Sequence, residues 1–193
     1  LCDLLEFVEN KKNTTTFGTT GIEIDGKYED NLVVKAWRMM HEEFNIPFVN
    51  IHLHKVIPVG AGLGGGSSDA AFMLEGLVSA FSVDCPDEKL SEMAGKLGSD
   101  WTFFFYNKPA FATGRGDELQ PSDINLKDYT VILVNPRIHI SSANAYSEIT
   151  PSKPEVSLQE LIKLPVDEWK ENVGNDFERS IFKKYPEIKQ VKE

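Results

Sequence analysis

The residues best suited to chemistry form a glycine-rich run from Pro58 to Asp69. Glycine has no Cβ, so a glycine-rich backbone adopts conformations that other residues avoid, and several N–H groups can approach one anion. Apolar residues at helical spacing follow the run and predict a helix from Ser68 to Phe81. Because the positive end of a helix dipole stabilises negative charge, the loop and helix together predict a phosphate site suited to phosphoryl transfer.

Three other structures can contain such a run. Gly60–Gly65 matches the GxGxxG spacing of dinucleotide-binding folds, and Asp84 lies near the expected distance downstream. In those folds, however, the preceding strand is buried on both faces, whereas Val49–His54 alternates between apolar and polar residues. A P-loop needs Gly-Lys-Ser/Thr, which does not follow the glycines, and a flexible linker seldom lies between so clear a strand and helix.

Asp100 is the main candidate for a catalytic side chain. It stands between Gly98, which ends a helix expected at Asp87–Leu97, and the apolar run Trp101–Tyr106, which predicts a strand. A partly desolvated carboxylate in such a place either caps the backbone or acts on a ligand. Given the glycine run, we favour the ligand, because transfer to an alcohol needs a group that orients the hydroxyl or accepts its proton.

The composition is that of a soluble globular protein and limits its partners. The 193 residues, 41% of them hydrophobic, suffice for one large domain or one domain and part of a second. A net charge of −10 argues against nucleic acid or an anionic membrane as the main partner and favours small molecules. Cys2 and Cys85 lie far apart without metal-binding spacing, which predicts a reducing, cytoplasmic location. No apolar run approaches the roughly 18 residues of a membrane span.

The other expected elements mix strands and helices without strict alternation. The segment Ala112–Asp117 predicts a tight turn. After Thr150 the sequence becomes more polar, helical and rich in proline, so a domain boundary is expected near residues 136–155. The remaining strands are expected at Asp3–Val8, Gly21–Ile24, Val49–His54, Ala110–Thr113 and Tyr129–Asn135, and the remaining helices at Asn31–Phe44, Leu158–Leu164 and Asn175–Tyr185.

The end of the strand at Val49–His54 leaves two alternatives open. His52 and His54 lie on one face, which is compatible with a shared metal, but a third ligand is not evident and a solvated sheet face is favoured. Lys55 either bends toward a bound nucleotide or is simply solvated, as lysines at strand ends more often are.

The order of these segments resembles the GHMP small-molecule kinases, named after galactokinase, homoserine kinase, mevalonate kinase and phosphomevalonate kinase. Pro58–Ala71 looks like the central phosphate-binding motif of that family, and Gly64–Asp69 is similar to members that act on a cytidine diphosphate-linked methylerythritol. Asp30–Ala36, Gly98–Phe105 and Asn175–Glu178 agree with further family segments in order and spacing. The resemblance spans nearly the entire chain.

The resemblance implies an α+β fold, with a ribosomal-protein-S5-like ATP-binding domain in residues 1–135 and part of a ferredoxin-like domain in residues 136–193. It also implies a kinase that uses ATP and Mg²⁺ to phosphorylate the 2-hydroxyl of the cytidine diphosphate-linked methylerythritol, in the non-mevalonate route to isoprenoid precursors. Such an enzyme is expected to be a monomer or a homodimer that binds neither nucleic acid nor a membrane.

Carried over position by position, the resemblance makes Asp100 the residue that orients or deprotonates the acceptor hydroxyl. It places Ser142 and Tyr146 near the cytidine end, where a tyrosine ring can stack on a pyrimidine, although helix packing explains Tyr146 equally well. Ser68 and Asp69 look like positions near magnesium, with the metal ligands left unassigned. The implied ATP-binding positions are Pro58, Gly60, Ala61, Gly62, Leu63, Gly64, Gly65, Gly66, Ser67, Ser68, Asn31 and Lys55.

Some family features differ or are not found. An initial Lys-x-Asn strand followed by a Tyr-His pair, and a later Ser-Gly-Ser-Gly motif, do not occur between Leu1 and Glu193, and Trp101 and Thr102 replace a small apolar residue and a proline. We therefore expect the middle of a longer enzyme, with both domains incomplete and no catalysis by these residues alone. Two alternatives stay open: another GHMP kinase of the mevalonate or homoserine type, and a non-catalytic nucleotide-binding module.

Overall fold

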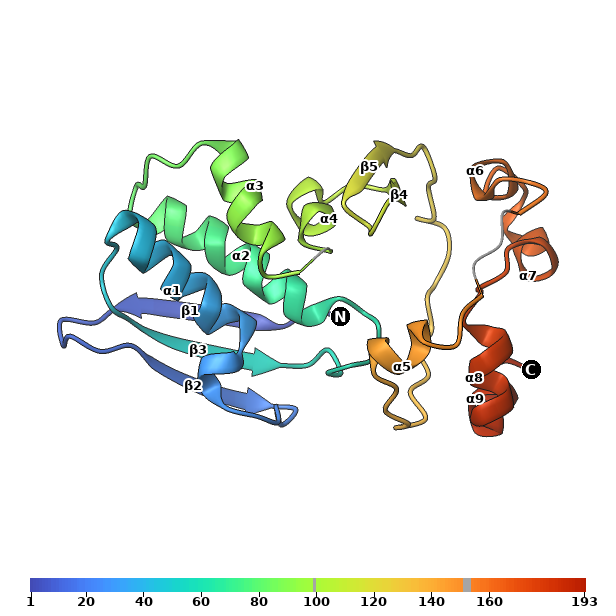
Figure 1. The fold of residues 1–193 in the computed structure, drawn as a ribbon, viewed down its shortest axis with the longest axis horizontal. Helices are drawn as coiled ribbons and strands as arrows, with labels where there is room; N and C mark the ends of the chain where they lie inside the picture. Colours follow the sequence, from blue (N-terminus) through green and yellow to red (C-terminus); the bar gives the residue numbers. More distant parts are fainter. Residues whose placement is uncertain (99, 151–153) are drawn as a thin grey trace. The chain divides into compact units, whose positions relative to one another are not determined.

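The computed structural model describes residues 1–98, 100–150 and 154–193, with Ser142 and Ala143 described by their backbone alone. Its residues cluster into two compact units (Figure 1). The first unit comprises residues 1–59 and 63–121, and the second comprises residues 60–62 and 122–193. Among the described residues, no helix is both long and apolar enough to cross a lipid bilayer.

A three-stranded sheet forms one layer of the first unit (Figure 1). The central strand is β3 (Val49–Lys55), with β1 (Leu4–Glu9) antiparallel on one side and β2 (Thr16–Gly21) parallel on the other. The chain thus reaches β3 from β2 through a helical crossover, as a parallel pair requires.

Strand β3 alternates between buried and more exposed residues, as its sequence predicts. Val49, Ile51 and Leu53 are buried on the face toward the helices, whereas His52 and His54 on the other face are half-buried. The prediction of a strand with one wet face is therefore confirmed.

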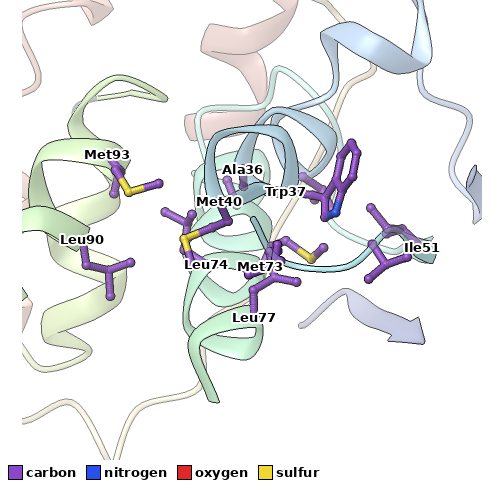
Figure 2. Packing of buried hydrophobic residues seen from close by; sticks show 14 of the residues in the cluster. Ala36, Trp37, Met40, Ile51, Met73, Leu74, Leu77, Leu90 and Met93 are labelled. Atoms are coloured by element: carbon purple, nitrogen blue, oxygen red, sulfur yellow. The ribbon is translucent and has the colours of Figure 1, made fainter. Parts of the chain in front are cut away.

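Helices α1 (Leu32–Phe44) and α2 (Gly65–Ala80) cover the apolar face of the sheet (Figure 1). In α1 the positions Val33, Ala36, Trp37 and Met40 recur at i, i+3, i+4 and i+7, so they form one apolar stripe. The helix follows η1, the 3₁₀ turn Tyr28–Asp30. Figure 2 shows the α1 side chains packed against Ile51, Met73, Leu74 and Leu77.

Three further elements complete the first unit. Helix α3 (Asp87–Gly95) adds Leu90 and Met93 to the core (Figure 2), and the prediction of a helix there is confirmed, although the helix ends before Gly98. Helix α4 (Trp101–Tyr106) packs against α2. The hairpin is formed by β4 (Ala110–Thr113) and β5 (Glu118–Pro121), so the expected strand and tight turn are also confirmed.

The expected strand at Trp101–Tyr106 is wrong, because these residues form α4. Its aromatic residues favour a strand by propensity, but Trp101 and Phe105 lie one helical turn apart and pack edge to face, with ring centroids 5.4 Å apart. Asn107 ends the helix in a left-handed conformation, with φ of +46°.

Two other strand predictions are wrong. Strand β2 ends at Gly21, where φ is +83°, so the expected strand at Gly21–Ile24 lies earlier, in the threonine-rich segment before it. Residues 129–135, all of them described, form neither helix nor strand, and Val131 and Ile132 are more than 80% exposed. An apolar run has strand propensity, but a strand needs a paired neighbour to be stable.

The second unit consists of short helices with no side chain buried among its described residues. The predicted helices near Leu158 and Asn175 are confirmed in shorter form, since α6 ends at Leu161 and α8 begins at Glu178. Its elements are α5 (Ser142–Tyr146), α6 (Leu158–Leu161), η2 (Val166–Glu168), α7 (Trp169–Asn172), α8 (Glu178–Lys184) and α9 (Pro186–Lys192).

Candidate functional site

Gly64 turns the chain from the glycine-rich run into α2. It is the N-cap residue of the helix with φ of +68°, a left-handed conformation that glycine adopts without steric penalty. The ring of Phe104 lies against it, because a Cβ built on Gly64 would be 2.7 Å from Phe104 Cζ. The first helical hydrogen bond runs from the N–H of Ser68 to the carbonyl of Gly64 at 2.9 Å, so the amides of residues 65–67 precede the helical ladder. This helix start has the donor arrangement that binds anions.

Asp100 lies in the same unit, at the N-cap position of α4. Two residues before it, Gly98 approaches the start of α2, since a Cβ built on Gly98 would be 3.7 Å from Ser67 Oγ. On its other side, a Cβ built on Gly116 in the hairpin turn would be 3.6 Å from Asp100 Oδ1. The fold therefore brings the Asp100 segment to the start of α2. Asp100 is exposed, and a helix, not the expected apolar strand, follows it. Its catalytic role stays a prediction.

Lys55 is buried, so the interpretation of a solvated lysine at a strand end is wrong. Its Nζ donates to Asp69 Oδ2 at 2.8 Å and to Asp3 Oδ2. The side chains of Lys55 and Asp3 are each 3% exposed, and that of Asp69 is 7% exposed. The physical reason is the strand register: Lys55 lies on the same face of β3 as its buried apolar residues.

The two carboxyl groups that share Lys55 titrate differently. Burial raises the pKa of Asp69 to about 6, a shift that Lys55 opposes and the charge of Asp3 reinforces. Burial also acts on Asp3, but hydrogen bonds from Lys55 and from the backbone of Ile57 and Val56 hold the pKa of Asp3 below its ordinary value. As the pH falls, Asp69 is therefore the first of the two to take up a proton.

Asn31 has a visible role in the fold. Its Oδ1 accepts a hydrogen bond from the N–H of Val33 at 2.9 Å, and its backbone is extended, so it caps the N-terminus of α1. This contact accounts for the residue type without a ligand. Its predicted position near the adenosine stays a prediction.

The outer part of the glycine-rich run differs from its inner part. Gly60–Gly62 cluster with the second unit, and in that unit the ring of His139 lies against Gly60, with a built Cβ 2.6 Å from His139 Cε1. Ala61 and Leu63 are exposed, and Pro58 is half-buried. The assignment of Pro58 to Ser68 to ATP stays a prediction.

Tyr146 ends α5 in the second unit and is 68% exposed. Its ring packs edge to face on Phe177, with ring centroids 5.1 Å apart and an interplanar angle of 87°. Ser142 begins α5, but its side chain lies outside the described residues. The contact with Phe177 fits a packing role, and the exposed ring fits a binding role. The role of Tyr146 at the cytidine end therefore stays a prediction.

The two histidines of β3 share a hydroxyl. Thr20 Oγ1 lies 3.2 Å from His52 Nε2 and 2.9 Å from His54 Nδ1. Within residues 1–98, 100–150 and 154–193, no group of three or more His, Cys, Asp or Glu side chains is arranged to hold a metal ion. The geometry is that of a polar sheet face, the alternative that the sequence favoured.

Asp3 is a structurally important residue that the sequence reasoning missed. Its Oδ1 accepts hydrogen bonds from the N–H groups of Val56 at 2.6 Å and Ile57 at 2.8 Å, directly before Pro58. The alternation of apolar and polar residues along β3 could have indicated it. The alternation places Lys55 on the buried face of the strand, where a charged group needs an acidic partner. That signal identifies the need for a carboxylate, although it does not identify Asp3.

Comparisons with known proteins show which family the chain resembles. Residues 31–108 match the family model described as GHMP kinases N terminal domain. The chain is 48% identical over 192 residues to the 4-diphosphocytidyl-2-C-methyl-D-erythritol kinase of Parabacteroides distasonis, an alignment that covers 99% of this chain and 70% of that relative. It is 47% identical to the kinase of the same name from Bacteroides fragilis, over 98% of this chain and 70% of that relative.

Solved structures give the same result. A crystal structure of 4-(cytidine 5'-diphospho)-2C-methyl-D-erythritol kinase aligns with a TM-score of 0.73 at 26% identity, over 98% of this chain and 67% of that chain. The homoserine kinase of Cytophaga hutchinsonii is similar in fold alone, with a TM-score of 0.52 at 14% identity over 83% of this chain and 54% of that chain. The predicted α+β fold of the GHMP kinase type is confirmed, and the chain belongs to the GHMP kinase family of ATP-dependent kinases.

Proposed function

We propose that this protein transfers the γ-phosphoryl group of ATP to the 2-hydroxyl of 4-diphosphocytidyl-2-C-methyl-D-erythritol, in the non-mevalonate route to isoprenoid precursors. The observation that carries the proposal is the 48% identity over 99% of the chain with the kinase of that name from Parabacteroides distasonis. The matched residues include the glycine-rich run, the Asp100 segment and the second unit.

The start of α2 supplies the donors for the ATP phosphates in this proposal. The amides of residues 65–67 precede the first helical hydrogen bond, and α2 is 16 residues long, so its dipole is fully developed at Gly64. Fixed amides stabilise the charge that develops on the phosphate without having to reorganise during the reaction.

Asp100 orients the acceptor hydroxyl and takes its proton. The hydroxyl oxygen forms a bond to the γ-phosphorus, while the bond from that phosphorus to the β,γ-bridging oxygen breaks and its electron pair leaves with ADP. The hydroxyl proton passes to the Asp100 carboxylate. The proposal draws support from the approach of Gly98 to Ser67, since the Asp100 segment therefore lies near the start of α2.

Mg²⁺ fits this site chiefly as a companion of ATP. The hydroxyl of Ser68, half-buried near the start of α2, is the hard oxygen donor that we assign to it. Bound there, the ion would supply positive charge against the negative charge of the ATP phosphates. The Asp69 carboxylate is already paired with Lys55 and is not part of this assignment.

The remaining proposals concern specificity and assembly. We assign Ser142 and Tyr146 to the cytidine end and Asn31 to the adenosine side. We keep the division into an ATP-binding domain at residues 1–135 and a second domain at residues 136–193. A cytoplasmic monomer or homodimer suits an ATP-dependent enzyme with two free cysteines, Cys2 and Cys85.

The test is ADP release by the full-length protein with magnesium and ATP. Three alcohols are compared under identical conditions: 4-diphosphocytidyl-2-C-methyl-D-erythritol, mevalonate and homoserine. We expect turnover with the cytidine compound alone. Turnover with another alcohol would keep the kinase and change its substrate, and ATP binding without turnover of any of them would favour a non-catalytic nucleotide-binding protein.

A further inference from the structure

The buried charges around Lys55 link three segments that are far apart in the chain. Asp3 precedes β1, Lys55 ends β3, and Asp69 lies in α2 near its start. One ammonium group thus joins both carboxylates inside the first unit, with all three side chains less than a tenth exposed. We call Asp3, Lys55 and Asp69 the lysine cluster.

The lysine cluster holds the beginning of the glycine-rich run. Asp3 accepts from Lys55 with Oδ2 and from the N–H groups of Val56 and Ile57 with Oδ1, at 2.6 and 2.8 Å. Hydrogen bonds to an ionised acceptor are stronger than those between neutral groups. One carboxylate therefore fixes the backbone immediately before Pro58.

The same cluster also meets Gly65, the first residue of α2. A Cβ built on Gly65 would lie 2.9 Å from Lys55 Nζ and 2.9 Å from Ile57 Cγ2, so Gly65 packs directly on the ammonium group of Lys55 and on the side chain of Ile57. Asp69, one helical turn further on, accepts a second hydrogen bond from the lysine at 2.8 Å. Val56 and Ile57, directly before the run, and Gly65 within it are thus held by one group of charges.

We propose that Asp3, Lys55 and Asp69 are positioning residues, which fix Val56–Ile57 and Gly65 so that the amides at the start of α2 meet the ATP phosphates. The Lys55 side chain then acts on ATP through the loop, because its ammonium group is paired with Asp3 and Asp69. A buried ion pair is costly to desolvate and adds little net stability, so its value here is the geometry that it fixes. The inference rests on the proposed function, because it concerns the ATP site of that kinase.

The first test is ATP affinity, measured by titration calorimetry with magnesium on the full-length protein. In Asp3→Ala we expect the Kd for ATP to rise about tenfold, because the loop loses its anchor. If Lys55 instead bound the nucleotide directly, removal of a competing carboxylate would leave the Kd unchanged or lower it. The two possibilities therefore differ in the sign of the effect, and an unchanged or lower Kd overturns the proposal.

Steady-state kinetics separate positioning from general loosening. Asp3→Ala and Lys55→Met should each raise the KM for ATP about tenfold and leave the KM for the alcohol within twofold. The matched control is Lys89→Met, which removes a surface lysine that also lies 2.8 Å from a carboxylate, that of Glu43, and should change neither constant. Equal increases in both constants would overturn the proposal. If Asp3→Ala does not fold, Asp3→Asn keeps the shape and should raise the KM for ATP in the same direction.

Hydrogen exchange tests the anchor without any nucleotide. In Asp3→Ala or Asp3→Asn, the amides of Val56 and Ile57 should exchange at least tenfold faster, while those of α1 stay unchanged. Unchanged exchange at Val56 and Ile57 would overturn the proposal. This readout also separates the proposed function from the positioning role of Asp3. If the parent protein binds no ATP, the proposed function is contradicted, and the exchange rates still decide whether Asp3 holds the loop.

Discussion

The two units of this protein use their apolar residues in opposite ways. In the first unit the apolar side chains of α1, α2 and β3 form one continuous core, and Met40, Met73 and Leu74 are completely buried (Figure 2). In the second unit the apolar run at residues 131–134 is more than half exposed, and none of its described residues is buried. The difference indicates that the first unit has a packed apolar core, whereas the described residues of the second unit form none.

The strongest test of this division is the chemical step. Asp100→Asn removes the group that we expect to accept the proton, so kcat should fall about 10²- to 10⁴-fold while the KM for ATP stays within about threefold. Steady-state kinetics on the full-length protein measure both. Asp128→Asn changes an exposed aspartate of the second unit and serves as the control. Unchanged turnover in Asp100→Asn would remove Asp100 from the mechanism.

The difference in burial predicts a difference in stability. Leu74→Ala creates a cavity in the core of the first unit and should lower the free energy of unfolding by about 2–5 kcal/mol, as measured by urea denaturation. Val131→Ala removes the same kind of group from an exposed position and should change that free energy by less than about 0.5 kcal/mol. Similar losses in both variants would mean that the second unit has a core of its own.

The stability of the first unit should depend on pH through Asp69, and urea denaturation over a pH series measures this dependence. The folded pKa of Asp69 is raised from 3.8 to about 6, so its protonated form contributes stability at low pH that is lost as the pH rises through about 6. Asp69→Asn has no such loss. Relative to the parent, the variant should therefore gain up to about 3 kcal/mol between pH 4 and pH 7, at about 1.4 kcal/mol per pKa unit. A difference that does not change with pH would show that the pKa of Asp69 is ordinary.

The smallest predicted effect concerns the surface of the second unit. Tyr146→Ala should raise the KM for the cytidine substrate about tenfold, because a tenfold change corresponds to the upper part of the energy range for aromatic stacking. The KM for ATP should stay within twofold. Phe177→Leu, which changes the ring packed against Tyr146, is the matched control for helix packing. If the two variants behave alike, Tyr146 is a packing residue.

Much of the first unit follows from its sequence, because its patterns are local. The alternation of β3, the apolar stripe of α1 and the glycines before α2 each specify an element without help from the rest of the chain. The residues of α4 do not specify their element in this way, since an aromatic run fits either a strand or a helix. The packing of Trp101 on Phe105 favours the helix.

The candidate site was predictable in part for the same reason. The glycine-rich run has a clear local pattern, and the fold brings it near the Asp100 segment through Ser67 and Gly98. The anchor at Asp3 depends on the pairing of β1 with β3, which is a long-range contact that no local pattern encodes. The burial of Lys55 is an intermediate case. The alternation of β3 predicts that Lys55 lies on the buried face, but it does not predict which carboxylates pair with it.

The anchor at Asp3 also sets an order for folding during synthesis. Asp3 must wait for Val56 and Ile57 to leave the ribosome, which at roughly 5–20 residues per second takes several seconds. Until then β1 has no partner, since β3 is the strand with which it pairs. The glycine-rich run therefore takes its final shape only after β1 has docked on β3.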